Sequence, residues 1–271
     1  MNVSFVGGGN MANALIGGLL QQGAAASSLR VIDVSSDARN AVQRRFGVAV
    51  FADLRQGCAG SDIIILAVKP QQLREVALEL KALLQSQIVI SIAAGIRTRD
   101  LSRWLGGYSR IVRVMPNTPA LVGAGISGLY AMPKVALAER QQAEAILSAV
   151  GSTLWLEHED QLDAITAVSG SGPAYVFYFI EALQRAAQEL GLDAQRAKQL
   201  SLDTFAGAVK LAKQETDDAQ ILRQRVTSKG GTTERAISAM EQAQLQRHII
   251  NAVRAAQERS RELGDEFGKA E

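Results

Sequence analysis

The chain has 271 residues, of which 29 are Lys or Arg and 27 are Asp or Glu, so its formal net charge is only +2. The sequence contains no basic cluster with interleaved aromatic residues, and nucleic acid and membrane surfaces are therefore poor candidates as partners. No apolar run approaches the roughly 20 residues that span a bilayer, and two histidines and one cysteine show no metal-site spacing, so we expect no metal.

Cys58 is the only cysteine, so an internal disulfide is impossible and a reducing compartment fits the sequence. We interpret Cys58 as a small buried side chain and not as a nucleophile. A strand is predicted to begin directly after Met1, which leaves no room for a signal peptide there. We therefore expect a cytoplasmic protein.

The first elements predict a nucleotide-binding turn. Val3–Val6 is a short apolar strand, the glycine-rich segment Gly7–Ala12 follows, and apolar residues at helical spacing come next. Gly7 and Gly9 take the first and third positions of a G-x-G-x-x-G/A pattern, with Ala12 at the last. These positions serve a tight turn, a close approach of pyrophosphate, and close packing of helix on strand. The pattern and its flanks predict a dinucleotide-binding site.

A second strand, Leu29–Asp33, ends in an acidic residue where the adenosine ribose of a dinucleotide is expected. A carboxylate at Asp33 favours a free 2′-hydroxyl and so NADH, and it repels a 2′-phosphate. Ser35, Ser36 and Arg39 follow, and they could instead hydrogen-bond or pair with the 2′-phosphate of NADPH. Asp33 is therefore expected to tune the choice of cofactor.

The continuous apolar run Ile63–Val68 predicts a strand that is buried on both faces, as in a parallel sheet. Ile88–Ile92 and Arg110–Met115 predict two further strands. Strands that alternate with helical spacing imply right-handed crossovers and a doubly wound sheet. Ligands of such sheets lie beyond the carboxyl ends of the strands. Three polar or glycine-bearing turns occur there: Lys69–Gln71, Ala94–Gly95 and Asn117–Thr118.

From about Leu162 the strand-like runs disappear and amphipathic helical spacing replaces them. Two long helices are predicted, from Pro173 to Leu190 and from Leu200 to Lys213. We therefore predict an α/β Rossmann-type dinucleotide-binding domain at residues 1–157 and an all-helical domain at residues 158–271. The helical domain is apolar and short of aromatic residues, which suits packing between subunits.

The two histidines and the C-terminal segment are not expected to take part in catalysis. His158 and His248 lie in polar, helix-like surroundings, and we expect both at the surface. Asp265–Glu271 is expected to be a frayed tail.

The segment Val226–Ile237 is the most informative in the chain, because a glycine pair and two threonines stand directly before a helix-like run. Glycine lets backbone approach a ligand closely. The first amides of a helix have no internal partners, and the helix dipole favours an anion beside them. Ser228, Thr232 and Thr233 add hydroxyl groups. The segment suits a small carboxylate, although an isolated segment of this kind is more often a solvated helix cap.

In order and spacing, six motifs of this chain closely resemble those of the pyrroline-5-carboxylate reductase family, over essentially its whole length. The motifs are Gly7–Ala12, Ala67–Pro70, Ala93–Gly95, Met115–Pro119, Ser169–Tyr175 and Val226–Thr233. The resemblance implies an N-terminal Rossmann domain and a C-terminal helical dimerisation domain, with dimers often assembled into decamers. It implies hydride transfer from NAD(P)H to C5 of the cyclic imine 1-pyrroline-5-carboxylate, which gives L-proline in the last step of proline biosynthesis.

The resemblance also implies site residues. The substrate carboxylate would rest on Ser228 and the backbone amides of Gly231, Thr232 and Thr233, and the Thr233 hydroxyl would face the ring nitrogen as the catalytic group. The expected cofactor-binding residues are Val6, Gly7, Gly8, Gly9, Asn10, Met11, Asp33, Ser35, Ser36, Ala67, Val68, Lys69, Pro70, Ala93, Ala94 and Gly95. The family resemblance favours NADPH, with NADH also usable.

The chain departs from the family pattern at Lys229, where proline is usual. The substitution removes a fixed φ and restores an N–H, so the rigidity of the loop is in question. Lys229 could add positive charge near the carboxylate, but we favour a side chain that points to solvent.

Two other functions are compatible with the Rossmann-type pattern: a β-hydroxyacid dehydrogenase and a non-catalytic dinucleotide sensor. β-Hydroxyacid dehydrogenases share the two-domain plan but take a proton with a lysine, and Val176 stands at the lysine's place while Phe179 and Ile180 stand at that of a following asparagine. An apolar residue cannot relay a proton. A non-catalytic dinucleotide sensor would keep the Gly7–Ala12 turn but would not need the segment Ser228–Thr233.

Overall fold

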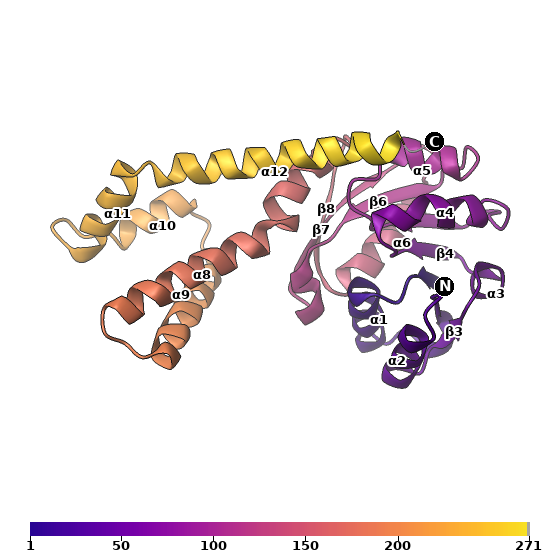
Figure 1. Cartoon of the computed structure of the whole chain (residues 1–271), viewed down its shortest axis with the longest axis horizontal. Coiled ribbons are helices and arrows are strands. Elements are labelled where there is room, and N and C mark those ends of the chain that lie inside the picture. The colour runs from indigo at the N-terminus through magenta and orange to yellow at the C-terminus, as the bar shows by residue number, and fades with distance from the viewer. Residues whose placement is uncertain (270–271) are drawn as a thin grey trace. The chain divides into compact units, whose positions relative to one another are not determined.

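The computed structural model describes residues 1–269, which form two compact units (Figure 1). The first unit is Met1–Ser171 together with the residues from Ala256 onward, and the second unit is Gly172–Ala255. The units therefore divide later than the expected boundary after residue 157. The reason is packing, because Leu162 and Ala167 are buried and the Ile165 side chain lies against Gly128 of the sheet.

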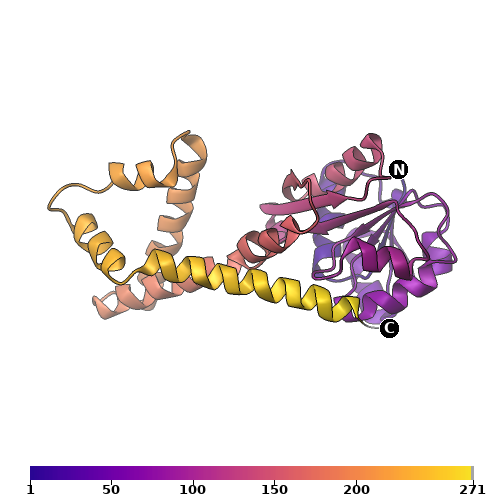
Figure 2. The same cartoon turned by 90° about the horizontal axis from the view of Figure 1, so that it is seen from above.

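The first unit is built on one eight-stranded sheet with helices on both faces (Figures 1 and 2). Its strands are β1 (Val3–Val6), β2 (Leu29–Ile32), β3 (Ala49–Phe51), β4 (Ile63–Leu66), β5 (Ile88–Ser91), β6 (Ile111–Met115), β7 (Gly125–Ala131) and β8 (Gly151–Trp155). The spatial order is β3-β2-β1-β4-β5-β6-β7-β8. All neighbours are parallel except β6 and β7. The order reverses between β1 and β4, which is the crevice where doubly wound sheets bind ligands.

The helices of the first unit are α1 (Asn10–Gln21), α2 (Ser36–Phe46), α3 (Leu54–Cys58), α4 (Pro70–Leu80), α5 (Thr98–Trp104), α6 (Leu137–Ser148) and α7 (Gln161–Ile165), with short turns η1 (Ala26–Ser28), η2 (Thr118–Val122) and η3 (Thr166–Gly170). The second unit contains α8 (Gly172–Glu189), α9 (Ala194–Gln214), α10 (Ala219–Arg225), α11 (Thr232–Gln242) and the first part of α12 (Leu245–Gly268). The two long predicted helices are confirmed as α8 and α9.

The five predicted strands are present, and each continuous apolar run is buried on both faces of the sheet. In β4, Ile63 and Ile65 enter the core under α1 and α6, while Ile64 and Leu66 enter the core under α3, α4 and α5. Successive side chains of a strand point to opposite faces of the sheet, so β4 contributes to the hydrophobic cores on both faces. The sequence analysis missed β3, β7 and β8, because β3 is very short and the other two carry glycine, serine and threonine in place of an apolar run.

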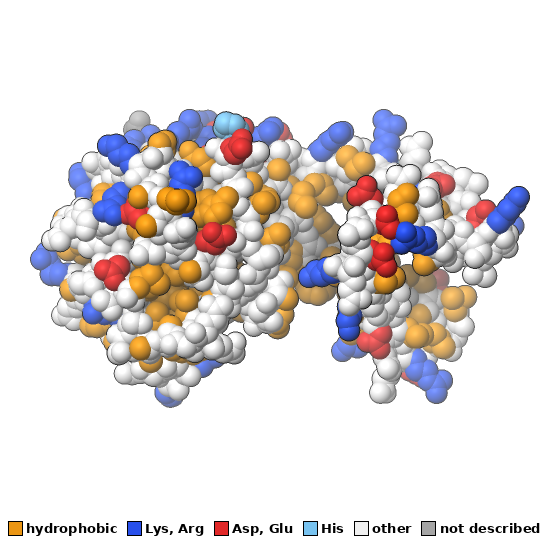
Figure 3. All heavy atoms as spheres, turned by 180° about the vertical axis from the view of Figure 1, so that it is seen from behind, with side chains coloured by type: hydrophobic (Ala, Val, Ile, Leu, Met, Phe, Trp, Pro, Cys, Tyr) orange, Lys and Arg blue, Asp and Glu red, His pale blue; other side chains and the backbone are white. Residues whose placement is uncertain are grey.

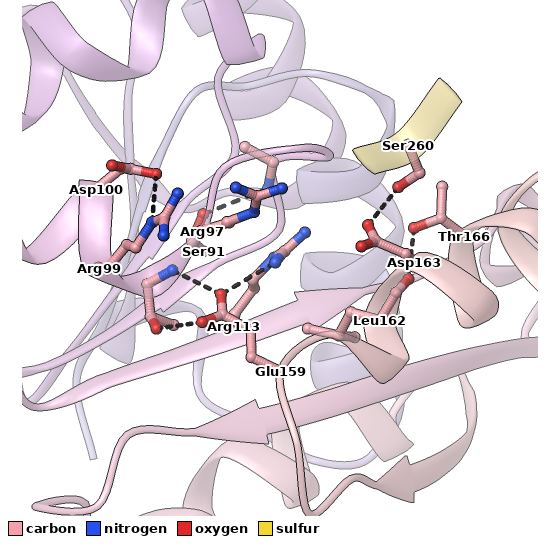
Figure 4. A network of polar contacts seen from close by, with 12 residues as sticks. Ser91, Arg97, Arg99, Asp100, Arg113, Glu159, Leu162, Asp163, Thr166 and Ser260 are labelled. Atoms are coloured by element: carbon pink, nitrogen blue, oxygen red, sulfur yellow. Dashed lines mark hydrogen bonds and ion pairs between the residues drawn. The ribbon is translucent and has the colours of Figure 1, made fainter. Parts of the chain in front are cut away.

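A buried ionic network joins the segment before α7 to the middle of the sheet (Figure 4). A carboxylate oxygen of Glu159 accepts from Nη1 of Arg113 at 3.0 Å. The same carboxylate accepts from the backbone N–H and the hydroxyl of Thr98, at 2.6 and 2.7 Å. Only 7% of the Arg113 side chain is exposed, so its charge depends on Glu159 for compensation.

The end of α12 packs on this unit, and the expectation of a frayed tail is wrong for Asp265–Gly268. Phe267 packs against the core under α4 and α5, and Nη1 of Arg97 donates to Asp265 at 2.5 Å. The hydrogen bond from Arg97 lowers the pKa of Asp265. Ser260 donates to the buried carboxylate of Asp163 at 2.7 Å (Figure 4). Residues 270–271 of the expected tail lie outside the described residues.

The second unit buries very little of its own apolar surface. Among its described residues only Ile180, Ala197 and Ser201 are buried. Large apolar side chains are exposed along its helices, and Phe177 and Tyr178 are 66% and 72% exposed. Figure 3 shows such side chains at the surface. In residues 1–269 no helix is long and apolar enough to cross a membrane.

We predict that Glu159→Ala lowers the free energy of unfolding by about 3–5 kcal/mol, because Arg113 would be left buried without its counter-charge. Urea denaturation measures the change. The control is Glu157→Ala, an exposed carboxylate two residues away that should cost less than about 0.5 kcal/mol. Equal midpoints for the two variants would show that the network contributes nothing.

Candidate active site

The turn after β1 depends on Gly7. Its φ is +103°, in the region that disfavours side chains, and a Cβ there would lie 2.7 Å from the carbonyl oxygen of Ala67. The backbones after β1 and β4 therefore approach each other too closely for any residue except glycine. This contact brings Gly7, Ala67 and Val68 together at the crevice where the strand order reverses, which is where doubly wound sheets bind ligands.

The carboxylate of Asp33 ties the end of β2 to the same turn. Oδ2 accepts from the Gly8 backbone N–H at 2.8 Å, and Oδ1 accepts from the Ser35 backbone N–H at 2.9 Å. Ser35 caps α2 by accepting from Ala38, and Ser36 is the first residue of that helix. Asp33 is thus placed where the sequence predicted it, with a structural role as well.

The turn presents unpaired backbone donors at the start of α1. Gly9 is the N-cap and has no side-chain cap, and the first amide of α1 with an internal bond is that of Asn13, to the Gly9 carbonyl. A Cβ on Gly9 would meet no atom within 4 Å, so the space beside it is open. The amides of Asn10 and Met11 face the start of the helix, which favours an anion such as pyrophosphate.

Asn13 is a supporting residue that the sequence analysis did not identify. Its Nδ2 donates to the carbonyls of Gly8 and Gly9 at 2.7 and 2.8 Å. It therefore holds the turn from the carbonyl side while Asp33 holds it from the amide side. A polar amide in the first turn of a helix that follows a glycine turn is the only signal in the sequence.

A pocket of about 390 Å³ opens beside β1, β2 and α4. We call it the β2 pocket. Of the predicted cofactor residues, Val6, Gly7, Asp33 and Val68 line it. The lining residues that the sequence analysis missed come from the ends of β2 and β3 and from one face of α4: Ile32, Val34, Ala52, Asp53, Leu54, Gln72, Glu75, Val76 and Glu79. These residues come from segments that are separated in the sequence, so only the folded chain brings them together around the pocket.

The other predicted cofactor residues lie at the carboxyl ends of β4 and β5. Lys69 is exposed and is the N-cap of α4, with Pro70 at the first helical position. Ala93 is buried, and Ala94 is half-buried. Gly95 is buried against Phe267 of α12, since a Cβ there would lie 3.2 Å from the ring. These turns follow neighbouring parallel strands and so share one edge of the sheet with the glycine turn.

Two motifs that are far apart in the sequence contact each other at the end of β6. Asn117, which is 9% exposed, donates from Nδ2 to the Ser169 carbonyl at 3.1 Å and accepts from the Ile126 N–H at 2.9 Å. A Cβ on Gly170 would lie 2.6 Å from the Met115 side chain. The segment Ser169–Gly170 belongs to η3, a π-helical turn that precedes α8. π-Helical turns are frequent at functional sites.

The predicted substrate segment lies in the second unit, between α10 and α11. The Gly231 N–H donates to the Ser228 carbonyl at 3.0 Å, and Gly230 has a φ of +72°. These are features of a type II turn with Lys229 at the second position, where proline is common. The turn therefore forms without the proline, and Lys229 is exposed, as we favoured.

The Ser228–Thr233 loop leads directly into the N-terminus of α11. Thr232 and Thr233 are the first two residues of this helix, and both are exposed. The first internal bond of α11 is made by the amide of Arg235, to the Gly231 carbonyl. The amides of Thr232 and Thr233 thus stand at the positive end of the helix without an internal partner. The Gly231 amide, by contrast, donates to the Ser228 carbonyl within the turn. It is therefore less available to bind a ligand than the sequence suggested.

The first unit supplies few groups for acid–base chemistry. His158 is exposed, as is His248 in the second unit. Burial raises the pKa of Cys58 to about 11, so its thiol stays protonated near neutral pH and is a poor nucleophile. Residues 1–269 contain no group of three or more His, Cys, Asp or Glu side chains arranged to hold a metal ion.

Comparison with known proteins agrees with this geometry over the full chain. A family model described as pyrroline-5-carboxylate reductase dimerisation matches residues 159–263, and one described as NADP oxidoreductase, coenzyme F420-dependent, matches residues 2–95. The pyrroline-5-carboxylate reductase of Pseudomonas aeruginosa is 43% identical over 268 residues, which cover 98% of each chain. The chain belongs to the pyrroline-5-carboxylate reductase family.

Solved structures give the same relationship. A pyrroline-5-carboxylate reductase from Coxiella burnetii is 44% identical with a TM-score of 0.92, and the match covers 97% of this chain and 98% of that one. A pyrroline carboxylate reductase from Plasmodium falciparum, solved with NADP bound, is 31% identical with a TM-score of 0.88 and the same coverage. The fold class of a Rossmann-type sheet followed by a helical region is thereby confirmed.

We predict that Lys229→Pro raises the free energy of unfolding by about 0.4–1 kcal/mol, because proline presets the backbone at the second position of this turn. Turnover should stay within about twofold, since the Lys229 side chain is exposed. Thermal unfolding and steady-state kinetics measure the two effects. Gly230→Ala is the matched control and should destabilise the loop, because its φ is positive. A tenfold loss of kcat/KM in Lys229→Pro would mean that the lysine contributes to the site.

Proposed function

We propose that this protein reduces 1-pyrroline-5-carboxylate to L-proline with a nicotinamide dinucleotide as hydride donor. Membership of the pyrroline-5-carboxylate reductase family over nearly the whole chain carries the proposal. The two anion-favouring helix starts, at Gly9 and at Gly231, support it from the geometry. The reaction is the last step of proline biosynthesis.

The residues at the carboxyl edge of the sheet fit the cofactor. The open space beside Gly9 and the unpaired amides at the start of α1 suit a pyrophosphate, and the β2 pocket suits an adenosine. When bound, a reduced nicotinamide supplies the hydride. The role of the turns at Ala67–Pro70 and Ala93–Gly95 is to position the cofactor and exclude water from it.

The Ser228–Thr233 loop fits the substrate carboxylate. The amides of Thr232 and Thr233 lie at the positive end of α11, and the hydroxyls of Ser228 and Thr233 add donors beside them. We assign the Thr233 hydroxyl to the ring nitrogen, where it orients the imine for hydride addition at C5. The amide of Gly231 is held in the turn and acts by shaping it.

Reduction of an imine makes a small demand on acid–base catalysis. The iminium form accepts a hydride and gives a neutral amine, so alignment of the reacting atoms is the main contribution of the protein. The lack of a lysine at Val176 agrees with this and disfavours a β-hydroxyacid dehydrogenase, which must remove a proton. A non-catalytic sensor would not need the Ser228–Thr233 loop.

The exposed apolar helices of the second unit support a homodimer. Phe177, Tyr178 and Leu183 of α8 are exposed in a single chain, and a stable soluble unit rarely leaves such a surface uncovered. A partner that covers them would complete the core that this unit lacks, with each active site shared between the two chains. Assembly of dimers into a decamer and a cytoplasmic location stay predictions.

We predict that Thr233→Ala lowers kcat/KM for 1-pyrroline-5-carboxylate by roughly ten- to hundredfold, because a polar contact to a reacting group contributes about 1–3 kcal/mol. The dissociation constant for the cofactor should not change. Thr233→Ser keeps the hydroxyl and is the matched control, with most of the activity retained. Wild-type kcat/KM in Thr233→Ala would refute the role assigned to this residue.

We predict that activity depends on the dimer. Phe177→Asp should place a charge on the exposed apolar face of α8 and dissociate the protein, so that light scattering reports a monomer and turnover is lost. Leu137→Asp is the control, because Leu137 is also exposed, at 72%, but lies at the start of α6 in the first unit. A monomer with full activity would contradict the shared site.

A further inference from the structure

The β2 pocket carries an excess of acidic groups that bears on the choice of cofactor. Four of its lining residues are carboxylates: Asp33, Asp53, Glu75 and Glu79. Among the described residues that line it, none is Lys, Arg or His. An adenosine placed at the end of β2 would therefore meet only negative charge from side chains. This inference rests on the proposed function, because it concerns the cofactor of the same reaction.

The carboxylates are held by different elements, so the acidity belongs to the fold of the pocket. Asp33 follows β2 and is fixed by the amides of Gly8 and Ser35. Asp53 caps α3 by accepting from the Gln56 amide at 2.9 Å. Glu75 and Glu79 are one helical turn apart on α4 and are both exposed.

The nearest cation of the loop after β2 is already engaged. Nη1 of Arg39 donates to the backbone carbonyls of Asp33 and Val34, at 2.6 and 3.0 Å. Arg39 does not line the pocket, and on α4 the side chain of Arg74 lines a different cleft, beside Trp104 and Phe267. Nη1 of Arg39 is thus bound to the backbone, and neither Arg39 nor Arg74 is among the residues that line the β2 pocket, where a guanidinium would pair best with a phosphate.

We propose that the β2 pocket selects an adenosine ribose with both hydroxyls free, and that this reductase binds NADH more tightly than NADPH. Carboxylates accept hydrogen bonds from ribose hydroxyls and repel the extra negative charge of a 2′-phosphate. This inference departs from the NADPH expected from the family resemblance, and the NADP in the Plasmodium falciparum structure belongs to that protein.

Binding measurements without substrate test the inference apart from catalysis. Titration calorimetry of the full-length protein would compare NADH with NADPH, and ADP-ribose with 2′-phospho-ADP-ribose. We expect the unphosphorylated member of each pair to bind at least about tenfold more tightly at low salt, and the ratio to shrink at 0.5 M KCl as the charges are screened. Equal affinities, or tighter binding of the phosphorylated members, would overturn the inference and leave the proposed function intact.

A substitution at Val34 provides a second test of the inference. Val34 lines the pocket but is 88% exposed, so Val34→Arg can add a cation without disturbing the hydrogen bonds of Asp33. We expect the affinity for 2′-phospho-ADP-ribose to rise about tenfold and that for ADP-ribose to change less than twofold. Val34→Gln adds a polar side chain without a charge; it is the control and should change neither affinity.

Two further results would overturn the inference. Affinity for 2′-phospho-ADP-ribose that is unchanged in Val34→Arg would place the ribose elsewhere. If the wild type preferred the phosphorylated ligand and Arg39→Gln lost that preference, Arg39 would be identified as the partner of the phosphate. Failure of all four ligands to bind would count against the inference and also against the proposed function, which separates that outcome from the others.

Discussion

The close approach of two backbone turns, after β1 and after β4, is the constraint on which the cofactor site depends. Gly7 lies so near the Ala67 carbonyl that no side chain fits between them, and its φ is one that glycine adopts easily. That contact sets the path of the turn that leads from β1 into α1. Asp33 and Asn13 then hold the amides and carbonyls of the turn from opposite sides. The open anion site at Gly9 is a consequence of this arrangement.

The well-buried first unit contrasts with the second unit, which buries few of its own side chains. The sheet has a core on each face, and the buried pair of Glu159 and Arg113 links its centre to the segment before α7. The second unit has long helices but almost no buried side chains of its own. The hydrophobic effect scales with the apolar area removed from water, so this unit needs a second chain to bury its surface. The Ser228–Thr233 loop belongs to that unit, so the substrate site that we propose there would be connected with assembly.

The acidic β2 pocket, in the role proposed for it, separates the choice of cofactor from the rest of the site. In the proposed complex the glycine turn and α1 would bind the pyrophosphate that NADH and NADPH share, and they would not distinguish the 2′ position. Side chains after β2 and β3 and on α4 line the pocket where we propose that the 2′ position is recognised. Substitutions there can alter cofactor choice while the turn, the sheet and the substrate loop stay the same.

Much of the fold followed from the sequence alone, and the sequence also provided the hypothesis for the site. Continuous apolar runs fixed the central strands, because strands buried on both faces must be apolar throughout. The glycine turn could be predicted because backbone geometry requires glycine locally. The Ser228–Thr233 segment was predicted as a substrate site from its helix start, its hydroxyl groups and the family resemblance. Strands β7 and β8 were not predicted, because they contain glycine and polar residues in place of a continuous apolar run. Burial of such residues depends on the neighbouring elements.

The tertiary structure decided the features that combine distant segments. Gly231 looked free to bind a ligand, but its amide closes a turn with Ser228. Asp265 and Phe267 looked like a tail, but Arg97 and the core under α4 hold them in place. The acidic lining of the β2 pocket required three elements to meet. Local sequence patterns determine what each segment can form, whereas charge balance and burial depend on which segments the fold brings together.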